Sequence, residues 1–271
     1  MKKKRITSLL LCAGLLCCLV SGARAWEAPV ISAPYDHQFQ DERRMITVNR
    51  IVDGDTVYFV ADVQLSSASD FRTRTDPAMA PVSVLAQQAG AVLAINGDDY
   101  AAHKYGVIIR NGELLRAHDT TRNLLCVDAK GDMSVRIDRK GEDSKALGKQ
   151  LTDSGALQTF EFGPVLVQDG QAAAFSKDFD LISTRASRLE PRTAIGQVGP
   201  LHYVIIVADG RQEGYSAGMS LPKLQELFLS FGAQTAMNLD GGGSSEIWFQ
   251  GEILNRPAGG EERYVSDILC F

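Results

Sequence analysis

The sequence predicts an α+β fold, a single domain with a mixed, largely antiparallel β-sheet core flanked by a few helices. Short strand-like runs dominate the 271-residue chain, glycine-containing turns separate many of them, and only a few segments have apolar residues at helical spacing. A doubly wound parallel sheet would need strands and helices in regular alternation, which this order of elements lacks.

The first 25 residues have the features of a signal peptide. Residues 2–5 are basic, residues 6–20 are apolar, and Ala23-Arg24-Ala25 forms a cleavage site of the A-x-A type. The apolar run is too short for a comfortable membrane span. We therefore expect cleavage near Ala25, a secreted or extracytoplasmic (cell-envelope) protein, and no stable membrane span after cleavage.

Charge narrows the possible partners of the mature chain. Cleavage removes five basic residues and no acidic one, which leaves 23 basic and 33 acidic residues and a net charge of −10. Such a balance argues against nucleic acid or an anionic membrane as partner. Only Cys126 and Cys270 remain, and both lie in strand-like segments. They either pair in an oxidising compartment or form core thiols.

The rest of the chain divides into a polar N-terminal arm over residues 26–44, expected to be irregular, and one domain over residues 45–271. Three hairpins are predicted inside this domain, and the second turns at an Asn-Gly pair. The expected segments are hairpins at 46–65, 105–116 and 123–137, a loop at 66–77, a polar excursion or short helix at 139–155, strands at 160–167, 201–207, 235–237, 248–254 and 264–271, and an ambiguous stretch at 172–190.

One unit occurs twice: a helix, a glycine, a short apolar strand and then Asn-x-Asp. It covers residues 81–98 and 221–240, and the paired positions are always 142 residues apart. Ser220 is a suitable N-cap for the second helix, Pro222 lies in its first turn, and Gly232 suits its C-terminal end. Because ligands often bind beyond the carboxyl ends of strands, we expect the two loops to meet at one site. Chance similarity of two ordinary helix–strand units is the alternative.

The second loop contains the densest run of unusual residues, Asn238 to Ser245, with three consecutive glycines. Glycine costs backbone entropy, so such a run indicates positive φ angles or the close approach of a ligand to bare backbone. Backbone N–H groups beside an aspartate and two hydroxyls suit an anion, a sugar or a metal. The alternative interpretation is a tight turn.

Four stretches together resemble the phosphodiester glycosidase family: residues 94–98, 191–196, 207–211 and 238–245, with a looser match over 255–265. The resemblance covers roughly residues 55–271, and five motifs in the right order are more specific than any one of them. It implies hydrolysis of a sugar–phosphate diester between the anomeric carbon and the phosphate. Many bacterial members of this family look like secreted envelope or exopolysaccharide proteins.

The chain departs from the family pattern at three places. Asp99-Tyr100 stands where two aromatic residues are more common, Glu246 follows the serine pair, and Gly259-Gly260 replaces a serine-containing turn. These differences bear on which sugar is recognised more than on the reaction.

The chemistry implied by the resemblance needs a carboxylate at the anomeric carbon and cations on the phosphate. Phosphate is a good leaving group, so a strong general acid is less necessary than in ordinary glycoside hydrolysis. Asp240 is the first catalytic candidate, as nucleophile, general base or oxocarbenium stabiliser, and Asp98 is the second carboxylate. Arg192 and Arg211 are candidate phosphate clamps. A structural pair with a carboxylate is the alternative for either arginine.

Further substrate contacts are expected from the same loops. The candidates are Asn96, Gly97, Thr193, Asp209, Asn238, Gly241, Gly242, Gly243, Ser244 and Ser245. Asn96 and Asn238 are also expected to support their loops through bonds to the backbone. Tyr100 either stacks on a sugar or packs in the protein, Glu190 is expected at the surface, and Arg263 is expected to pair with Glu262 in solvent.

Two other chemistries are open. No cofactor is predicted, but Asp98, Asp99, Asp209 and Asp240 could supply oxygens to Ca²⁺ or Mg²⁺, although no DxDxDG loop is present. A serine nucleophile would need a histidine base, for which only folding could bring His103 or His202 to Ser244 or Ser245.

The sequence thus predicts a secreted hydrolase that cleaves the anomeric carbon–phosphate linkage of sugar-1-phosphodiesters in glycans or cell-envelope polymers. The first alternative is a non-catalytic envelope protein that binds phosphoglycan or carbohydrate in the same pocket. The second is a structural envelope protein whose glycine loop is only a turn.

Overall fold

The computed structural model describes residues 34–175 and 186–271. The predicted signal peptide, the first part of the arm and residues 176–185 of the ambiguous stretch lie outside the described residues. Within them, strands outnumber helices, and the α-helices are α1 (Val82–Ala89), α2 (Ser144–Asp153) and α3 (Leu221–Ser230). None of these helices is long and apolar enough to cross a membrane. The α+β fold class is confirmed.

Eight strands form the larger sheet, in the order β1-β2-β3-β14-β13-β15-β11-β12. All of its strand pairs are antiparallel. The strands are β1 (His37–Gln40), β2 (Arg44–Asp53), β3 (Thr56–Leu65), β11 (Val165–Gln168), β12 (Gln171–Ala172), β13 (Arg192–Gly199), β14 (His202–Ala208) and β15 (Thr235–Asn238).

Five strands form the second sheet, in the order β17-β16-β5-β18-β4, again antiparallel throughout. The strands are β4 (Arg72–Pro81), β5 (Leu93–Asn96), β16 (Ile247–Phe249), β17 (Glu252–Ile253) and β18 (Tyr264–Cys270). The two strands of the repeated unit, β5 and β15, therefore belong to different sheets.

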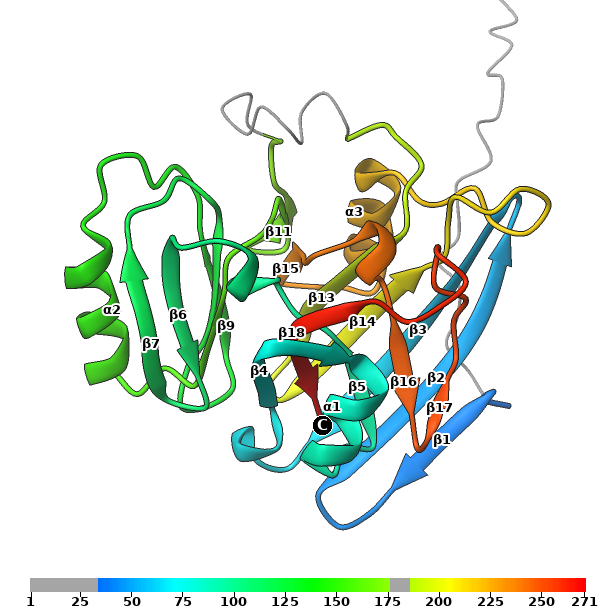
Figure 1. Ribbon diagram of the computed structural model, residues 1–271, viewed down its shortest axis with the longest axis horizontal. Coiled ribbons are helices and arrows are strands. Elements are labelled where there is room, and N and C mark those ends of the chain that lie inside the picture. The colour runs from blue at the N-terminus through cyan, green and yellow to red at the C-terminus, as the bar shows by residue number, and fades with distance from the viewer. Residues whose placement is uncertain (1–33, 176–185) are drawn as a thin grey trace, which may run out of the picture.

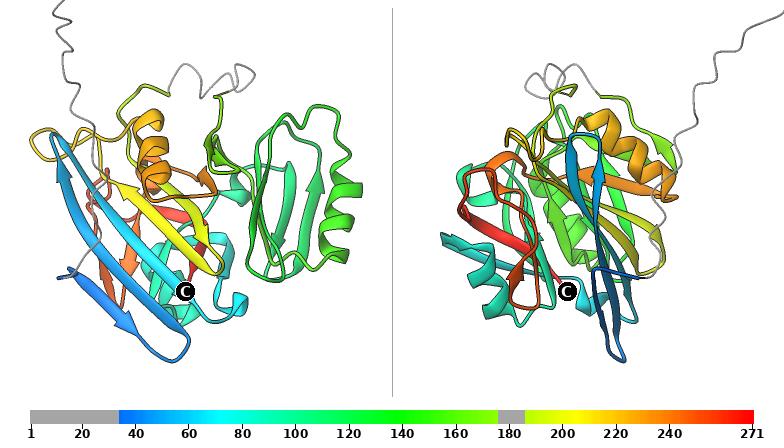
Figure 2. Two further views of the ribbon diagram at one scale, coloured as in Figure 1. Left: turned by 180° about the vertical axis from the view of Figure 1, so that it is seen from behind. Right: turned by 90° about the vertical axis from the view of Figure 1, so that its right-hand side faces the viewer.

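The main core lies between these two sheets. Side chains such as Ile46, Phe59 and Ile205 of the larger sheet pack in one buried cluster with Leu93 and Leu269 of the second sheet. Each fully buried side chain of this kind stabilises the fold by about 1.5–3 kcal/mol. Helix α3 covers the other face of the larger sheet, and α1 covers the other face of the second. The result is a four-layered arrangement, visible in Figures 1 and 2.

A separate lobe stands beside the two sheets. It contains β6 (Gly106–Arg110), β7 (Glu113–His118), β8 (Leu124–Val127), β9 (Met133–Arg136), β10 (Gln158–Phe160) and helix α2. Figures 1 and 2 show it on the opposite side of the molecule from the long β2–β3 hairpin. The chain leaves the main body after β5 and returns at β11, so the lobe is an insertion whose base adjoins the loop after β5.

Local sequence signals explain the helix ends. The Ser220 hydroxyl accepts a hydrogen bond from the backbone N–H of Lys223 at 3.3 Å, and Pro222 lies in the first turn of α3, as predicted. Beyond the helix Gly232 has φ of 77°. Helix α1 ends in the same way at Gly90, with φ of 59°. These conformations are open to glycine at little cost.

The three predicted hairpins are confirmed as β2–β3, β6–β7 and β8–β9. Three expectations need correction. Residues 37–40 of the arm form β1, the predicted loop at 66–77 contains most of β4, and the predicted strand at 160–167 is interrupted between β10 and β11. Strands β1 and β4 are edge strands with polar and charged residues, so they lack the apolar alternation by which a strand is recognised.

The two cysteines of the domain are free and buried, one in β8 and one in β18, so they do not form the disulfide considered above. Burial raises the pKa of each thiol, Cys126 and Cys270, to about 11. They are core residues.

Candidate active site

The loops that follow β5 and β15 lie against each other. The Asn96 side-chain Nδ2 donates to the carbonyl oxygen of Asp240 at 2.7 Å, and the backbone N–H of Asp240 donates to the carbonyl of Gly97 at 3.3 Å. Two similar units in different sheets thus contribute to one place, as their common pattern predicted.

Both asparagines of the repeated unit support these loops. The Oδ1 atom of Asn96 accepts from the Thr193 hydroxyl at 2.7 Å and from the backbone N–H of Glu246 at 3.2 Å. The Nδ2 atom of Asn238 donates to the carbonyl of Gly163 at 2.9 Å. Asn96, Asn238 and Thr193 are buried, so they act on loop conformation and do not present polar groups to a ligand.

Asp98 is completely buried and held by its neighbours. Its Oδ1 accepts from Nη2 of Arg110 at 2.7 Å, and its Oδ2 accepts from the backbone N–H of Glu161 at 2.6 Å. The same Arg110 Nη2 donates to Asp267 at 2.8 Å. Burial and the neighbouring Asp98 raise the pKa of Asp267 to about 7 even though Arg110 opposes this. Asp98 is therefore part of a buried ion cluster and is closed to substrate.

Its neighbour Asp99 is the acid that reaches solvent. Asp99 is partly exposed and has φ of 59°, a left-handed conformation that aspartate tolerates better than most residues. Burial and then repulsion by Asp240 raise the pKa of Asp99 to about 6, while Arg263 and Arg122 act in the opposite direction. Asp240 thus lies close enough to Asp99 to disfavour its charged form.

Asp240 is also partly exposed and is held by the glycine loop. Its Oδ1 accepts from the backbone N–H of Gly241 at 2.9 Å, and the Ser244 hydroxyl bonds to the carboxylate as well. Burial raises the pKa of Asp240, whereas these two hydrogen bonds and the positive charge of Arg263 favour its ionised form. The loop therefore orients a carboxylate and partly offsets the cost of its charge.

Each glycine of the loop has a close neighbour. A Cβ at Gly241 would lie 2.9 Å from the carbonyl oxygen of Pro191. Gly242 has φ of 63°, and a Cβ there would lie 3.1 Å from a guanidinium nitrogen of Arg211. A Cβ at Gly243 would lie 3.6 Å from the side chain of Arg263. Gly241 is thus required by the close approach of the Pro191 carbonyl, and Gly242 by its positive φ and the nearby Arg211, whereas the contact at Gly243 would be an ordinary one for a Cβ.

These two arginines are the exposed cations of the site. The Arg211 side chain is 53% exposed and donates through Nε to Glu190 at 2.6 Å, which leaves its Nη side against Gly242. The expected pair of Arg263 with Glu262 is wrong, because Glu262 instead accepts from the backbone and hydroxyl of Ser83 at 2.9 and 2.6 Å.

Two other predicted contact residues face the protein. Arg192 donates to the carbonyls of Met219 and Arg188 at 3.1 and 3.2 Å, and burial lowers its pKa to about 10. Asp209 is buried. Its carboxylate accepts from Asn255 Nδ2 at 2.9 Å, from the backbone N–H of Arg256 at 3.1 Å and from the Tyr215 hydroxyl at 2.8 Å. Arg192 and Asp209 thus fix the strand ends that carry the site.

The structure does not favour the serine–histidine alternative. His103 lies 3.1 Å from Nη1 of Arg122 through its Nε2, and His202 lies 2.7 Å from Asp62. Ser244 bonds to the Asp240 carboxylate, and the Ser245 hydroxyl is buried. Neither serine is thus paired with a histidine in the part of the chain that the structure describes.

Tyr100 is a packing residue. It is 7% exposed, and the guanidinium carbons of Arg110 and Arg116 lie 5.4 and 5.6 Å from the centre of its ring. Sequence reasoning missed Arg110 and Arg122, which the lobe brings to the site from distant positions. Arg110 carried one usable signal: it ends an apolar strand just before the Asn111-Gly112 turn, where a buried cation is unexpected.

These features define a class of protein: two antiparallel sheets whose loops bring a pair of acids and a pair of arginines to a glycine-rich turn. The chain belongs to the phosphodiester glycosidase family, whose model matches residues 89–271. The recognition made from the sequence motifs is confirmed.

Among known proteins, the chain is 32% identical over 225 residues to the SPbeta prophage-derived uncharacterized protein YomE of Bacillus subtilis (strain 168). The match covers 77% of this chain and 33% of that protein, so the chain spans about a third of the length of this relative.

Two solved structures share the fold. One is the zebrafish N-acetylglucosamine-1-phosphodiester alpha-N-acetylglucosaminidase catalytic domain, auto-inhibited by its pro-peptide, with a TM-score of 0.64, 16% identity and coverage of 90% of this chain and 86% of that one. The other is a hypothetical protein from Synechocystis, with a TM-score of 0.62, 14% identity and coverage of 84% and 62%.

Proposed function

We propose that the protein, exported through its signal peptide, hydrolyses the linkage between the anomeric carbon and the phosphate of a sugar-1-phosphodiester in a glycan or cell-envelope polymer. One observation carries the proposal. Two partly exposed carboxylates, Asp99 and Asp240, share a small region with the exposed guanidiniums of Arg211 and Arg263, around a turn of bare backbone. Membership of the phosphodiester glycosidase family supports it.

The arrangement assigns roles by charge. A diester phosphate is an anion, and the planar guanidiniums of Arg211 and Arg263 suit its oxygens. In this proposal Asp240, whose carboxylate is oriented by two hydrogen bonds, acts at the anomeric carbon as nucleophile or as stabiliser of the developing positive charge. Asp99 replaces Asp98 as the second carboxylate, because Asp98 is closed to substrate.

Asp99 is suited to move the proton of the attacking water. A carboxylate with a pKa of about 6 is ionised at neutral pH and is a stronger base than an ordinary aspartate. Asp98 and Arg110 act as positioning residues, since the buried ion pair that they form fixes the backbone from which Asp99 projects.

The test is turnover of a nitrophenyl phosphodiester of a sugar 1-phosphate by the purified mature chain. We expect Asp240→Asn to lose roughly 10²–10⁴-fold in kcat. Asp62→Asn is the control, because Asp62 is also partly buried but pairs with His202 at the opposite end of β14. Full turnover by Asp240→Asn would remove that residue from the mechanism. Binding of the diester without any release of sugar by the wild type would instead identify a binding protein.

A further inference from the structure

Two arginines outside the candidate active site converge on one tyrosine. The guanidinium carbon of Arg256 lies 4.0 Å from the centre of the Tyr215 ring, and that of Arg50, which belongs to β2, lies 6.0 Å from it. Both arginines are exposed, and Tyr215 is partly exposed. Cation–π contact with a shared ring thus holds two like charges near each other at the surface, where they repel. We call these three residues the Tyr215 cluster.

Neither guanidinium of the cluster has an ion-pair partner in the part of the chain that the structure describes. Asp209 is buried and accepts from the Tyr215 hydroxyl at 2.8 Å. Asp36 accepts from the backbone N–H of Arg50 at 2.6 Å and forms no ion pair with its side chain. The exposed Glu213 is likewise unpaired among the described residues. The two positive charges are therefore left to solvent.

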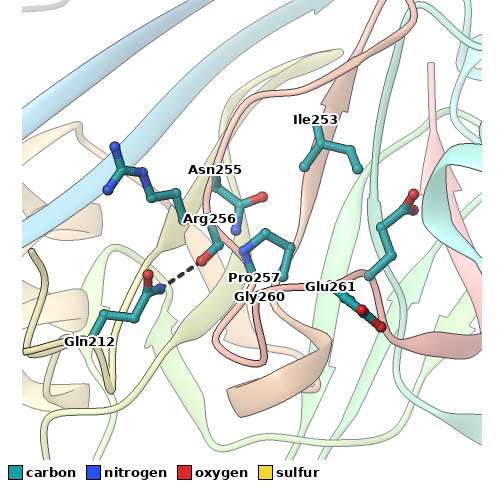
Figure 3. A pocket seen from close by; sticks show the side chains of 8 residues that line it. Gln212, Ile253, Asn255, Arg256, Pro257, Gly260 and Glu261 are labelled. Carbon is teal, nitrogen blue, oxygen red and sulfur yellow. Dashed lines mark hydrogen bonds between the residues drawn. The ribbon is translucent and has the colours of Figure 1, made fainter.

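The Tyr215 cluster is tied to one of the candidate phosphate clamps. Tyr215 lies in the short loop that begins at Arg211, and the backbone N–H of Gln212 closes this loop by donating to the carbonyl of Ser216 at 3.0 Å. The side chain of Gln212 donates to the carbonyl of Arg256 at 2.8 Å, the bond drawn in Figure 3. Figure 3 also shows the guanidinium of Arg256 directed away from the pocket in that view. One loop thus connects the clamp Arg211 to the cluster.

This gathering of arginines contrasts with the charge of the whole chain, which is −5. The exposed arginines Arg50, Arg211, Arg256 and Arg263 come from three segments that the contacts above join. A guanidinium matches the oxygens of a phosphate, and an unpaired one breaks no internal ion pair when it binds. Arginines that gather on one surface also attract polyanions in solution. An anion at the cluster would offset the repulsion between its two charges, whereas an uncharged ligand would not.

We propose that the Tyr215 cluster binds a second phosphate group of the same substrate, one that the reaction leaves intact. The inference rests on the proposed function, in which Arg211 and Arg263 hold the phosphate next to the bond that breaks. It narrows the substrate class to polyanions that carry phosphate groups at intervals along a chain. A single isolated diester would occupy the clamps and leave the cluster empty, so it would be bound more weakly.

Matched diesters of one sugar 1-phosphate test the second site. In each of them the phosphate is esterified to a straight-chain diol of varied length, whose far end is either a free hydroxyl or a phosphate. We expect the wild type to have a KM about tenfold lower for the best phosphate-ended diester than for its hydroxyl-ended partner. The double variant Arg50→Gln/Arg256→Gln should lose this preference. Arg74→Gln, which changes an exposed arginine of β4, is the control and should keep it.

The hydroxyl-ended diesters separate a lost binding site from a damaged fold. The double variant should hydrolyse them within twofold of the wild-type rate, because neither substituted guanidinium contacts the phosphate that is cleaved. Added salt should weaken the preference of the wild type, since the cluster is exposed and its charges are screened. The proposal is overturned by a wild type that shows no preference, by a preference that persists in the double variant, or by an equal loss on both series.

Failure of the proposed function has a different signature. If the wild type hydrolyses none of these diesters, titration of nitrogen-15-labelled protein with inorganic phosphate tests the cluster alone, through the NMR signals of the side-chain N–H groups of Arg50 and Arg256. Saturable shifts of both signals, with a smaller and non-saturating shift at Arg74, support a phosphate site. Shifts that are absent, or equal at all three arginines, refute it.

Discussion

At the scale of single residues, the site depends on how neighbouring charges are separated. Asp98 and Asp99 are adjacent in the chain, yet one is a buried ion-pair partner and the other faces solvent. The charge of Asp240 raises the pKa of Asp99, while Arg263 lowers the pKa of both acids. Pairs of carboxylates in unequal environments are how hydrolases divide acid and base roles between identical groups.

The raised pKa of Asp99 predicts how the rate of the proposed reaction depends on pH. Its pKa is raised to about 6, so the carboxylate is protonated below that pH and cannot accept the proton of water. We expect kcat/KM to fall about tenfold per pH unit below about pH 6. Asp99→Asn should lower kcat/KM roughly 10²–10⁴-fold and abolish this acid limb. Initial rates of wild type and Asp99→Asn, measured between pH 4 and 8, test this prediction.

The control for this measurement is Asp55→Asn in the exposed turn between β2 and β3, which should keep the wild-type profile. If an acid limb near pH 6 persisted in Asp99→Asn, the limb would belong to another group. Asp240 would then be the first candidate, since its pKa is also raised.

At the level of residues, some features of the candidate site carry a local signal. Asp240 and the three glycines stand out in the sequence, and the fold brings them beside Asn96 and Arg211. Asp98 was expected to meet substrate, but it is buried in an ion pair, which the sequence could not show because its partner Arg110 comes from the lobe. Arg263 was misjudged for the same reason: adjacency to Glu262 suggested a pair, and the fold sends Glu262 to Ser83 instead.

At the scale of elements, the junction of β5 and β18 is the tightest part of the site. Strand β18 pairs with β5 and delivers Asp267 directly against Gly97, the residue that follows β5. A Cβ at Gly97 would overlap the Asp267 carboxylate. Gly97 therefore serves the packing of two strands, and its presence in the Asn-Gly-Asp motif has a structural cause as well as any functional one.

Gly97→Ala should consequently destabilise the protein and disturb the Asp98–Arg110–Asp267 cluster. Overpacking of this kind costs about 1–3 kcal/mol in the free energy of unfolding. Chemical denaturation of wild type and variant measures it. The matched control is Gly259→Ala, where a Cβ would meet nothing within 4 Å and φ is not positive. A variant as stable as the control would show that the junction can relax.

Whether a helix or strand could be predicted depended on how near in sequence its stabilising contacts lie. Hairpins with Asn-Gly or Asp-Gly turns and helix α3 with its cap were predictable, because their stabilising contacts are between near neighbours. Edge strands β1 and β4 were not, because pairing with another strand compensates for their polar composition; the partner is the adjacent β2 for β1 and the distant β18 for β4. The repeated local pattern likewise could not show that β5 and β15 belong to different sheets.

At the scale of the whole molecule, buried carboxyl groups make stability depend on pH. Burial and the adjacent Glu262 raise the pKa of Glu246 to about 9. The folded state therefore retains a proton that the unfolded chain loses near its ordinary value, and stability must fall as the pH rises between those two values. One such group contributes a slope of at most about 1.4 kcal/mol per pH unit.

We expect the free energy of unfolding to decrease between about pH 5 and pH 9, and Glu246→Gln to make this decrease shallower. The amide keeps the size of the side chain and carries no titrating proton. Thermal unfolding at several pH values measures it, with Glu252→Gln, an exposed glutamate on β17, as the control. If Glu246→Gln showed the same slope as the wild type, the pH dependence would belong to Asp267 instead, whose pKa is raised to about 7.

The contact between the loops after β5 and β15 has a consequence for how the protein matures. Ile95 pairs with Leu269, and Asn96 bonds to Asp240, so the site is closed by segments more than a hundred residues apart. Long-range pairings of this kind form late, since their loop-closure entropy is offset only when the intervening chain is ordered. In partly folded chains, including any in transit across a membrane, the residues of the site would not yet be in contact with one another. Onset of the proposed activity would thus be a marker of completed folding.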